Sequence, residues 1–242
     1  MTQQVKNVLI TGAYGGLGSA LAKKYFLEGN NICLVGRDRK KTNILLGELR
    51  ALNKNSSVKP SVQCCDLNKK NDLIDLTKRV KNQFGDVDIL INCAGIFPVL
   101  SLEDTTIEKF SECIDVNLVA PFILIKQFAA GMKEKKWGRI INIASSSAYG
   151  GSSNTSAYCA SKHALLGLSR SLYKEMKKDN IRVFTVSPGS IQTDMGRDVE
   201  KLGQLYDTFM TAQEVADYVY HASSYDGHMI SEEIRLNRVF VQ

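Results

Sequence analysis

The sequence predicts a single-domain α/β protein with a doubly wound parallel sheet of about seven strands and helices on both faces. Six short apolar runs alternate with segments of helical periodicity, which is the pattern of repeated strand–helix units. A glycine-rich turn joins the first apolar run to the first helical segment. A chain of 242 residues that is 44% hydrophobic can bury one core, and nothing in its composition requires a second domain. We therefore treat residues 1–242 as one domain.

The predicted strands are nearly continuous apolar runs, as expected for parallel strands that are buried on both faces. The last of them alternates polar and apolar residues and would close the sheet. Strands are expected at Val5–Thr11, Asn31–Gly36, Ser61–Cys65, Asp88–Asn92, Arg139–Ala144, Ile181–Ser187 and Glu233–Val241.

The predicted helices place apolar residues three and four positions apart. We expect Pro121 to break the long fourth helix. Residues 194–211 are polar and lack a clear period, which predicts a short mobile lid over a substrate site. Helices are expected at Ser19–Glu28, Thr42–Asn53, Asn71–Phe84, from Thr106 to beyond Leu124, from Ser156 onward and at Ala212–Ser223.

The composition argues against several classes of function. The net charge is +6, but the lysines are spread along the chain without a basic stripe of interleaved aromatics, so we expect no nucleic-acid partner. The six cysteines form no C-x-x-C pair and no histidine lies at metal-ligand spacing from them, which predicts a reduced, cytoplasmic protein without a metal. We find no apolar run of the length needed to span a membrane, so we expect no membrane partner.

The glycine-rich turn at residues 12–18 is the first sign of a ligand. It lies between a strand and a helix, where glycines let the backbone turn tightly and approach a pyrophosphate. The free N–H groups and the positive dipole end of the helix would then bind that anion. This context favours a Rossmann-like nucleotide site over an ordinary glycine-rich turn.

The end of the second strand indicates which dinucleotide binds. Dinucleotide folds place an acidic residue there to bind the ribose hydroxyls, but this chain has Gly36 followed by Arg37. A guanidinium in place of a carboxylate suits a ribose 2′-phosphate, so we expect NADP(H) as the preferred cofactor and NAD(H) as the alternative. The competing interpretation is that this basic segment only solvates the start of a helix.

Polar and small residues follow the other predicted strands. Asp66 either accepts a hydrogen bond from an adenine amino group or caps the next helix, and the sequence leaves both interpretations open. Asn92 precedes a run of small residues at 93–95, which would let a cofactor lie against the strand end. Because the carboxyl ends of parallel strands share one edge, we expect these residues to form one site with Ser145 and Pro188–Gly189.

A tyrosine and a lysine lie one helical turn apart near the start of the helix at Ser156. The spacing of four puts Tyr158 and Lys162 on the same face, and the ammonium would lower the pKa of the phenol towards the working range of an acid. Asn117 lies inside the long fourth helix, where asparagine is unfavourable. It either holds a backbone carbonyl open through a water or is simply exposed.

These motifs, in this order, resemble those of the classical short-chain dehydrogenase/reductase family over nearly the whole chain. The resemblance runs from the family's cofactor turn and adenine-contact pair, through its Asn-Asn-Ala-Gly motif, to its catalytic tetrad and nicotinamide-side loop. The matching residues are Thr11–Gly18, Asp66–Leu67, Asn92–Gly95, the set Asn117, Ser145, Tyr158 and Lys162, and Pro188–Thr193.

The resemblance implies an NADP(H)-dependent oxidoreductase that transfers a hydride between nicotinamide and a carbonyl or secondary alcohol, as a 3-oxoacyl reductase or another keto reductase does. Tyr158 would protonate the substrate oxygen, Lys162 would lower the pKa of Tyr158 and bind the nicotinamide ribose, Ser145 would polarise the carbonyl, and Asn117 would hold a water linking Lys162 to solvent. The implied cofactor-binding residues are Gly12, Tyr14, Gly15, Gly16, Leu17, Gly18, Arg37, Asp66, Leu67, Asn92, Ala94, Gly95, Tyr158, Lys162, Pro188, Gly189, Ile191 and Thr193.

The resemblance also implies a small-molecule substrate and assembly as a homodimer or homotetramer. Gly15 stands where NADP-preferring members often carry a basic residue, so the cofactor preference depends on Arg37 and the missing acid at Gly36. The chain lacks the tail of the 3-oxoacyl reductases, which weighs against an acyl-carrier substrate. The segments that would select the substrate, 96–100, 147–155 and 194–210, do not name its chemical class.

The alternative function is a non-catalytic NADP(H)-binding sensor or scaffold on the same fold, because a fold does not fix a function. Such proteins usually lose a catalytic residue, whereas this chain keeps all of them. The intact tetrad therefore favours the enzyme.

Overall fold

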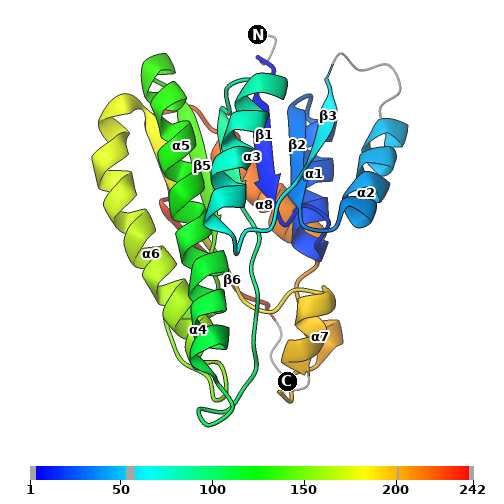
Figure 1. Ribbon diagram of the computed structural model, residues 1–242, viewed down its shortest axis with the longest axis vertical. Coiled ribbons are helices and arrows are strands. Elements are labelled where there is room, and N and C mark those ends of the chain that lie inside the picture. Colours follow the sequence, from blue (N-terminus) through cyan, green and yellow to red (C-terminus); the bar gives the residue numbers. More distant parts are fainter. Residues whose placement is uncertain (1–3, 53–57, 201, 240–242) are drawn as a thin grey trace.

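The computed structural model describes residues 4–52, 58–200 and 202–239, and its seven strands form one parallel sheet (Figure 1). The order across the sheet is β3-β2-β1-β4-β5-β6-β7. The chain thus winds outward from β1 on one side and from β4 on the other, which is the predicted doubly wound arrangement. The strands are β1 (Asn7–Thr11), β2 (Asn31–Gly36), β3 (Pro60–Cys64), β4 (Ile89–Asn92), β5 (Gly138–Ile143), β6 (Ile181–Pro188) and β7 (Glu233–Leu236).

Helices cover both faces of this sheet, as the sequence predicts (Figure 1). Successive residues of β1 point to opposite faces, so Val8 and Ile10 join one core and Leu9 joins the other. The helices on the first face are α1 (Gly16–Leu27), α2 (Arg39–Leu52) and α8 (Ala212–Ser224), and those on the second are α3 (Lys70–Gln83), α5 (Ala120–Lys135) and α6 (Ser156–Met176).

Two helices begin earlier than the sequence predicts. α1 starts at Gly16, inside the glycine turn. α2 starts at Arg39 because Asp38 Oδ1 accepts the backbone N–H groups of Lys40 (2.9 Å) and Lys41 (3.1 Å), which satisfies the first turn. The last strand, β7, is shorter than its predicted range. The predicted ends at Asn53 and Val241 lie outside the described residues.

The long fourth helix is continuous, so the expected break at Pro121 is wrong. α4 (Ile107–Ile114) passes through a π-helical turn at Asp115–Val119 into α5. Pro121 lies in the first turn of α5, directly after the wider π-helical turn, where proline is compatible with the helix.

Because the helix is continuous, its apolar part is longer than the sequence analysis expected. The helix from Ile107 to Lys135 is long and apolar enough to cross a membrane by length and composition alone, and 44% of its most apolar window is buried in this fold. The expectation that no apolar run reaches that length therefore does not hold for this helix. In the structure, Leu124, Ile125 and Phe128 of this helix belong to the core on the second face of the sheet.

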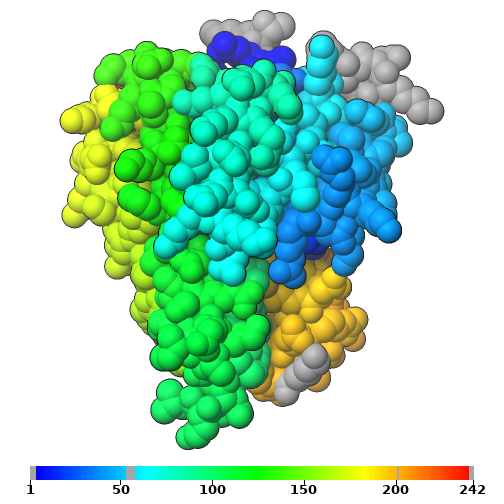
Figure 2. Space-filling model, viewed as in Figure 1, coloured from blue at the N-terminus to red at the C-terminus, as the bar shows by residue number. Residues whose placement is uncertain are grey.

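The segment predicted as a lid contains α7 (Asp194–Glu200) and a 3₁₀ turn at Tyr206–Thr208. A bridge between Ile191 and Met210 joins its two ends. In the space-filling view this segment, coloured gold, lies next to the green surface around α4, below the blue surface of the N-terminal half (Figure 2). Its mobility stays a prediction.

Candidate active site

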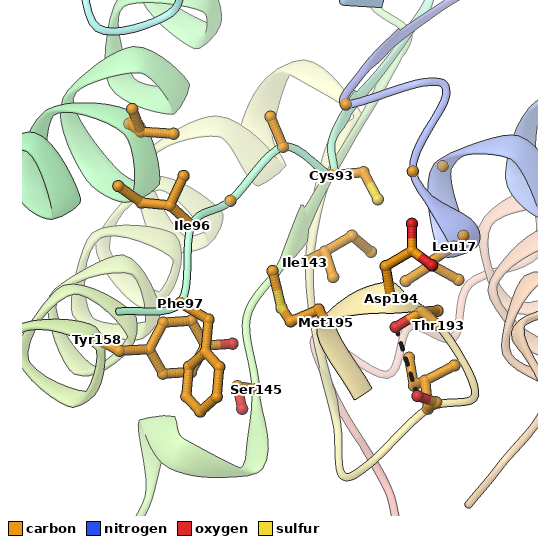
Figure 3. A pocket seen from close by; sticks show the side chains of 18 of the residues that line it. Leu17, Cys93, Ile96, Phe97, Ile143, Ser145, Tyr158, Thr193, Asp194 and Met195 are labelled. Atoms are coloured by element: carbon orange, nitrogen blue, oxygen red, sulfur yellow. Dashed lines mark hydrogen bonds between the residues drawn. The ribbon is translucent and has the colours of Figure 1, made fainter. Parts of the chain in front are cut away.

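A cleft of about 520 Å³ lies at the edge of the sheet where the strands end (Figure 3). Its walls come from the glycine turn, the residues after β2 to β6, the first turns of α6 and the predicted lid. Every predicted cofactor residue except Asn92 lines it, and so does every predicted catalytic residue except Asn117. Motifs that are scattered in the sequence therefore meet at one edge of the sheet.

The glycine turn is held against the end of β4. Gly12 has a φ of +64°, and a Cβ there would lie 2.7 Å from the Cα of Ala94, so no larger residue fits. Thr11 Oγ1 accepts the backbone N–H groups of Cys93 and Ala94, each at 3.1 Å. A Cβ on Gly18 would clash with the carbonyl oxygen of Gly12. Close backbone packing thus requires these glycines.

The N-terminus of α1 opens into the cleft. Gly15 is its N-cap residue, which supplies no side-chain cap, and the first turn contains no acidic residue. The free N–H groups and the positive end of the helix dipole are therefore available to an anion. This arrangement fits the diphosphate of a dinucleotide.

The end of β2 forms the basic corner of the cleft. Gly36 packs against the ring of Tyr14, because a Cβ on Gly36 would lie 2.6 Å from that ring. Arg37 is exposed and lines the cleft. The neighbouring acid, Asp38, is engaged in capping α2. The Asp38 carboxylate is thus occupied by the protein itself.

Asp66 lines the cleft and is not the N-cap residue of the next helix. Its Oδ1 accepts the backbone N–H of Asn68 at 3.2 Å, and the N-cap position of α3 is Lys69. The capping interpretation is therefore wrong in its simple form, although Asp66 does stabilise the turn that leads into α3.

Asn92 does not lie in the cleft, unlike its neighbour Cys93. Its side chain is buried, and Nδ2 donates to Oδ1 of Asn142 on β5 at 2.8 Å. Asn142 in turn donates to Ser169 on α6 at 2.9 Å. The Asn92 side chain therefore connects the sheet, through Asn142, to α6 from behind the cleft, and its contact with a cofactor stays a prediction.

Asn117 is buried in the π-helical turn, so the alternative that it is exposed is wrong. Its Oδ1 accepts the backbone N–H of Ile96 at 2.9 Å, and its Nδ2 donates to the Ile96 carbonyl and to Ser161 Oγ, both at 3.0 Å. The side chain thus fastens the segment after β4 to α6. The π-helical turn, a feature common at functional sites, places this amide in the interior.

Ser145, Tyr158 and Lys162 all line the wall of the cleft. Ser145 follows the carboxyl end of β5, and Tyr158 and Lys162 lie in the first two turns of α6. Figure 3 shows Tyr158 with Phe97 in front of it and Ser145 beside them; the two rings meet edge to face at 4.6 Å between centroids. Lys162 Nζ donates to the Ile143 carbonyl at 2.8 Å and lies 5.6 Å from the Tyr158 ring centroid.

Burial has the largest effect on the pKa values of Tyr158 and Lys162. Desolvation raises the pKa of Tyr158 to about 12, against a hydrogen bond with Ser145 that lowers it. Desolvation likewise lowers the pKa of Lys162 to about 8. The expected lowering of the phenol pKa by Lys162 is not found, because desolvation of the buried phenol dominates. At neutral pH, Tyr158 therefore holds its proton and Lys162 is mostly charged.

Phe97 and Glu112 are among the residues of the cleft wall that the sequence did not single out. Phe97 packs on Tyr158, and Glu112 on α4 faces the same space. Phe97 lies in a segment that sequence analysis assigned to substrate selection, but no motif marks it. Glu112 gave no signal, because helical spacing does not tell which residues of an exposed helix turn towards a cleft.

Metal chemistry finds no support in the part of the chain that the structure describes, where no group of three or more potential ligands clusters. All six cysteines are free thiols. Burial raises the pKa of Cys93 to about 12, so this cleft residue is a neutral thiol at physiological pH.

The family model described as short chain dehydrogenase matches residues 6–202. The chain belongs to the classical short-chain dehydrogenase/reductase family. It is accordingly an oxidoreductase that acts on CH–OH or carbonyl groups with NAD(P).

Similar proteins cover between 78% and 97% of this short-chain dehydrogenase/reductase. D-beta-hydroxybutyrate dehydrogenase of Rhizobium meliloti is 31% identical over 93% of this chain and 94% of the relative. A 3-oxoacyl-[acyl-carrier-protein] reductase of Rickettsia typhi is 35% identical over 78% of this chain and 74% of the relative. A solved metagenomic short-chain oxidoreductase in complex with NADP is 28% identical, with a TM-score of 0.83 over 97% and 98% of the chains.

Proposed function

We propose that this short-chain dehydrogenase/reductase is an NADP(H)-dependent carbonyl reductase, or alcohol dehydrogenase in reverse, with Tyr158 as its acid. The observation that carries the proposal is a buried, protonated tyrosine beside a serine hydroxyl and a buried lysine, in a cleft that also contains the glycine turn. The non-catalytic sensor is the weaker alternative, because the reactive side chains lie within one cleft.

The residues of the cleft fit NADP(H). The N-terminus of α1 would hold the diphosphate, Arg37 the 2′-phosphate, and the segment from Pro188 to Thr193 the nicotinamide side. The solved relative in complex with NADP supports this cofactor. When bound, the cofactor supplies or accepts the hydride.

The side chains of this protein would manage the proton and the carbonyl oxygen. Ser145 would donate a hydrogen bond to that oxygen and fix its position, while Tyr158 gives it a proton. The charge of Lys162 would stabilise the phenolate that remains. Asn117, whose amide is paired with Ile96 and Ser161, would keep the segment after β4 in place beside Lys162.

The cofactor preference is tested by removing the guanidinium at the end of β2. In Arg37→Ala we expect the ratio of kcat/KM for NADPH over NADH to fall about 10- to 100-fold, since a hydrogen bond to a charged group contributes about 1.5–3 kcal/mol. Arg39→Ala is the matched control, because Arg39 is also exposed but does not line the cleft. An unchanged ratio in Arg37→Ala would remove the basis for NADP(H) preference.

The activity itself is tested by following NADPH oxidation over a panel of uncharged ketones, keto acids and 3-oxoacyl thioesters. We expect turnover with at least one class. Tight binding of NADPH without turnover on the whole panel would favour the sensor or scaffold.

We also propose that the protein is a cytoplasmic homodimer or homotetramer. The free cysteines are consistent with a reducing compartment. Large apolar side chains remain exposed along the long helix, including Ile107 (78%) and Phe122 (45%). A second copy of this chain would remove them from water.

A further inference from the structure

The part of the cleft around Tyr158 has a mainly apolar wall. Its apolar side chains come from the segment after β4, from the long helix and from the predicted lid, and Figure 3 shows Ile96, Phe97 and Met195 among them. Hydroxyl residues that precede α6 also line this part of the cleft. The apolar residues are Ile96, Phe97, Val116, Met195, Val199 and Leu202, and the hydroxyl residues are Ser147, Ser152 and Thr155.

Among the described residues, the acid in this wall is Glu112, which projects from α4. Asp194, at the start of α7, lines the cleft beside Leu17 and Thr193, away from Tyr158 (Figure 3). Lys162 is the one cation among the described residues that line this part, and its ammonium donates to the Ile143 carbonyl. Arg37, the other cation of the cleft, follows β2 and lies on the far side of β1.

Three further cations on the long helix, the predicted lid and the C-terminal segment have partners within the protein. Arg197 pairs with Glu200 at 3.0 Å. Lys109 lies outside the cleft lining and pairs at 3.1 Å with Glu112 itself, an exposed ion pair of the kind that contributes little net energy, so the Glu112 carboxylate still presents negative charge to the cleft. Arg238 donates to a threonine hydroxyl of the predicted lid at 2.9 Å. None of these three cations lines the cleft. An anionic substrate would therefore lose its water without gaining a positive partner.

We propose that the substrate is an uncharged, mainly apolar ketone or its alcohol, and that Glu112 discriminates against substrates that carry a carboxylate or phosphate. This inference rests on the proposed function. In the reduction, the carbonyl carbon gains the hydride of NADPH and its oxygen gains the proton of Tyr158, so the products are the alcohol and NADP⁺. A carboxylate near that carbonyl would be desolvated beside a like charge, which a neutral group of the same shape avoids.

The test compares isosteric ketones that differ in charge: 4-acetylbenzamide against 4-acetylbenzoate, and acetoacetamide against acetoacetate. We expect wild-type kcat/KM with NADPH to favour each amide by at least about tenfold. Glu112→Gln should reduce that preference about tenfold, and Glu112→Arg should reduce it further. Glu108→Gln is the matched control on the same helix, because Glu108 does not line the cleft, and it should keep the wild-type ratio.

The outcomes separate the two proposals. Preference for the acids, or an amide preference that Glu112→Gln leaves unchanged, would overturn this inference while the carbonyl reductase stands. Failure to oxidise NADPH with any neutral or acidic ketone would overturn the proposed function and this inference with it.

Discussion

Tyr158 owes its proposed role to its surroundings more than to its spacing from Lys162. It is packed against Phe97 with Ser145 beside it, and burial holds its pKa near 12. A protonated phenol is what a carbonyl reduction needs at neutral pH. The ammonium of Lys162 would then act after proton transfer, by stabilising the phenolate.

The pH dependence of reduction should follow Lys162. Its pKa is lowered to about 8 by burial, so its charge is present below that pH and is lost as the pH rises through it. Tyr158 stays protonated over this range. We expect kcat for ketone reduction to fall above about pH 8. Measured from pH 6 to 10, Lys162→Met should be slower and should lack this inflection; an inflection that persists would assign it to another group.

At the scale of elements, the glycine turn and the start of α1 form one rigid unit. Gly18 is packed against the Gly12 carbonyl, while Thr11 holds the turn to the end of β4. The position of the proposed diphosphate site thus depends on backbone contacts that a single methyl group would disturb.

Gly18→Ala should therefore weaken both NADPH binding and the fold. We expect a loss of about 1–3 kcal/mol in the free energy of unfolding, because overpacking forces the turn to move. Gly47→Ala is the control: it lies inside α2 with no atom within 4 Å of the added Cβ, and it should stabilise the protein by about 0.5–1 kcal/mol. Urea unfolding and NADPH titration measure both effects, and equal behaviour of the two variants would contradict the packing argument.

The sequence predicts the elements and most of the cleft wall, because strand ends and glycine turns have local signatures. It does not predict the orientation of Asn92, since both sides of a buried strand end look alike in sequence. The π-helical turn around Asn117 is equally hidden, because the partners of its side chain, the Ile96 backbone and Ser161, come from distant parts of the sequence. The pKa of Tyr158 also departs from expectation, because the depth of burial is a property of the folded chain.

At the scale of the whole molecule, the sheet buries its two faces under six helices but leaves the long helix partly uncovered. Ile107, Phe110 and Phe122 are the large apolar residues exposed on it. Phe122→Glu should shift the protein to a smaller species in analytical ultracentrifugation, because it places a charge in the proposed interface. Met229→Glu, at an exposed apolar position on another surface, should keep the wild-type size. A wild-type monomer would contradict the proposed assembly.

The central claim is that this cleft transfers a hydride and that Tyr158 supplies the proton. The direct measurement is transfer of deuterium from NADPH deuterated at C4 to the carbinol carbon of a ketone product, with rates compared in wild type, Tyr158→Phe and the exposed control Tyr218→Phe. We predict deuterated alcohol from wild type and Tyr218→Phe, and a rate about 100- to 10,000-fold lower in Tyr158→Phe. Undiminished transfer in Tyr158→Phe, or none in the wild type with any ketone, would contradict the account.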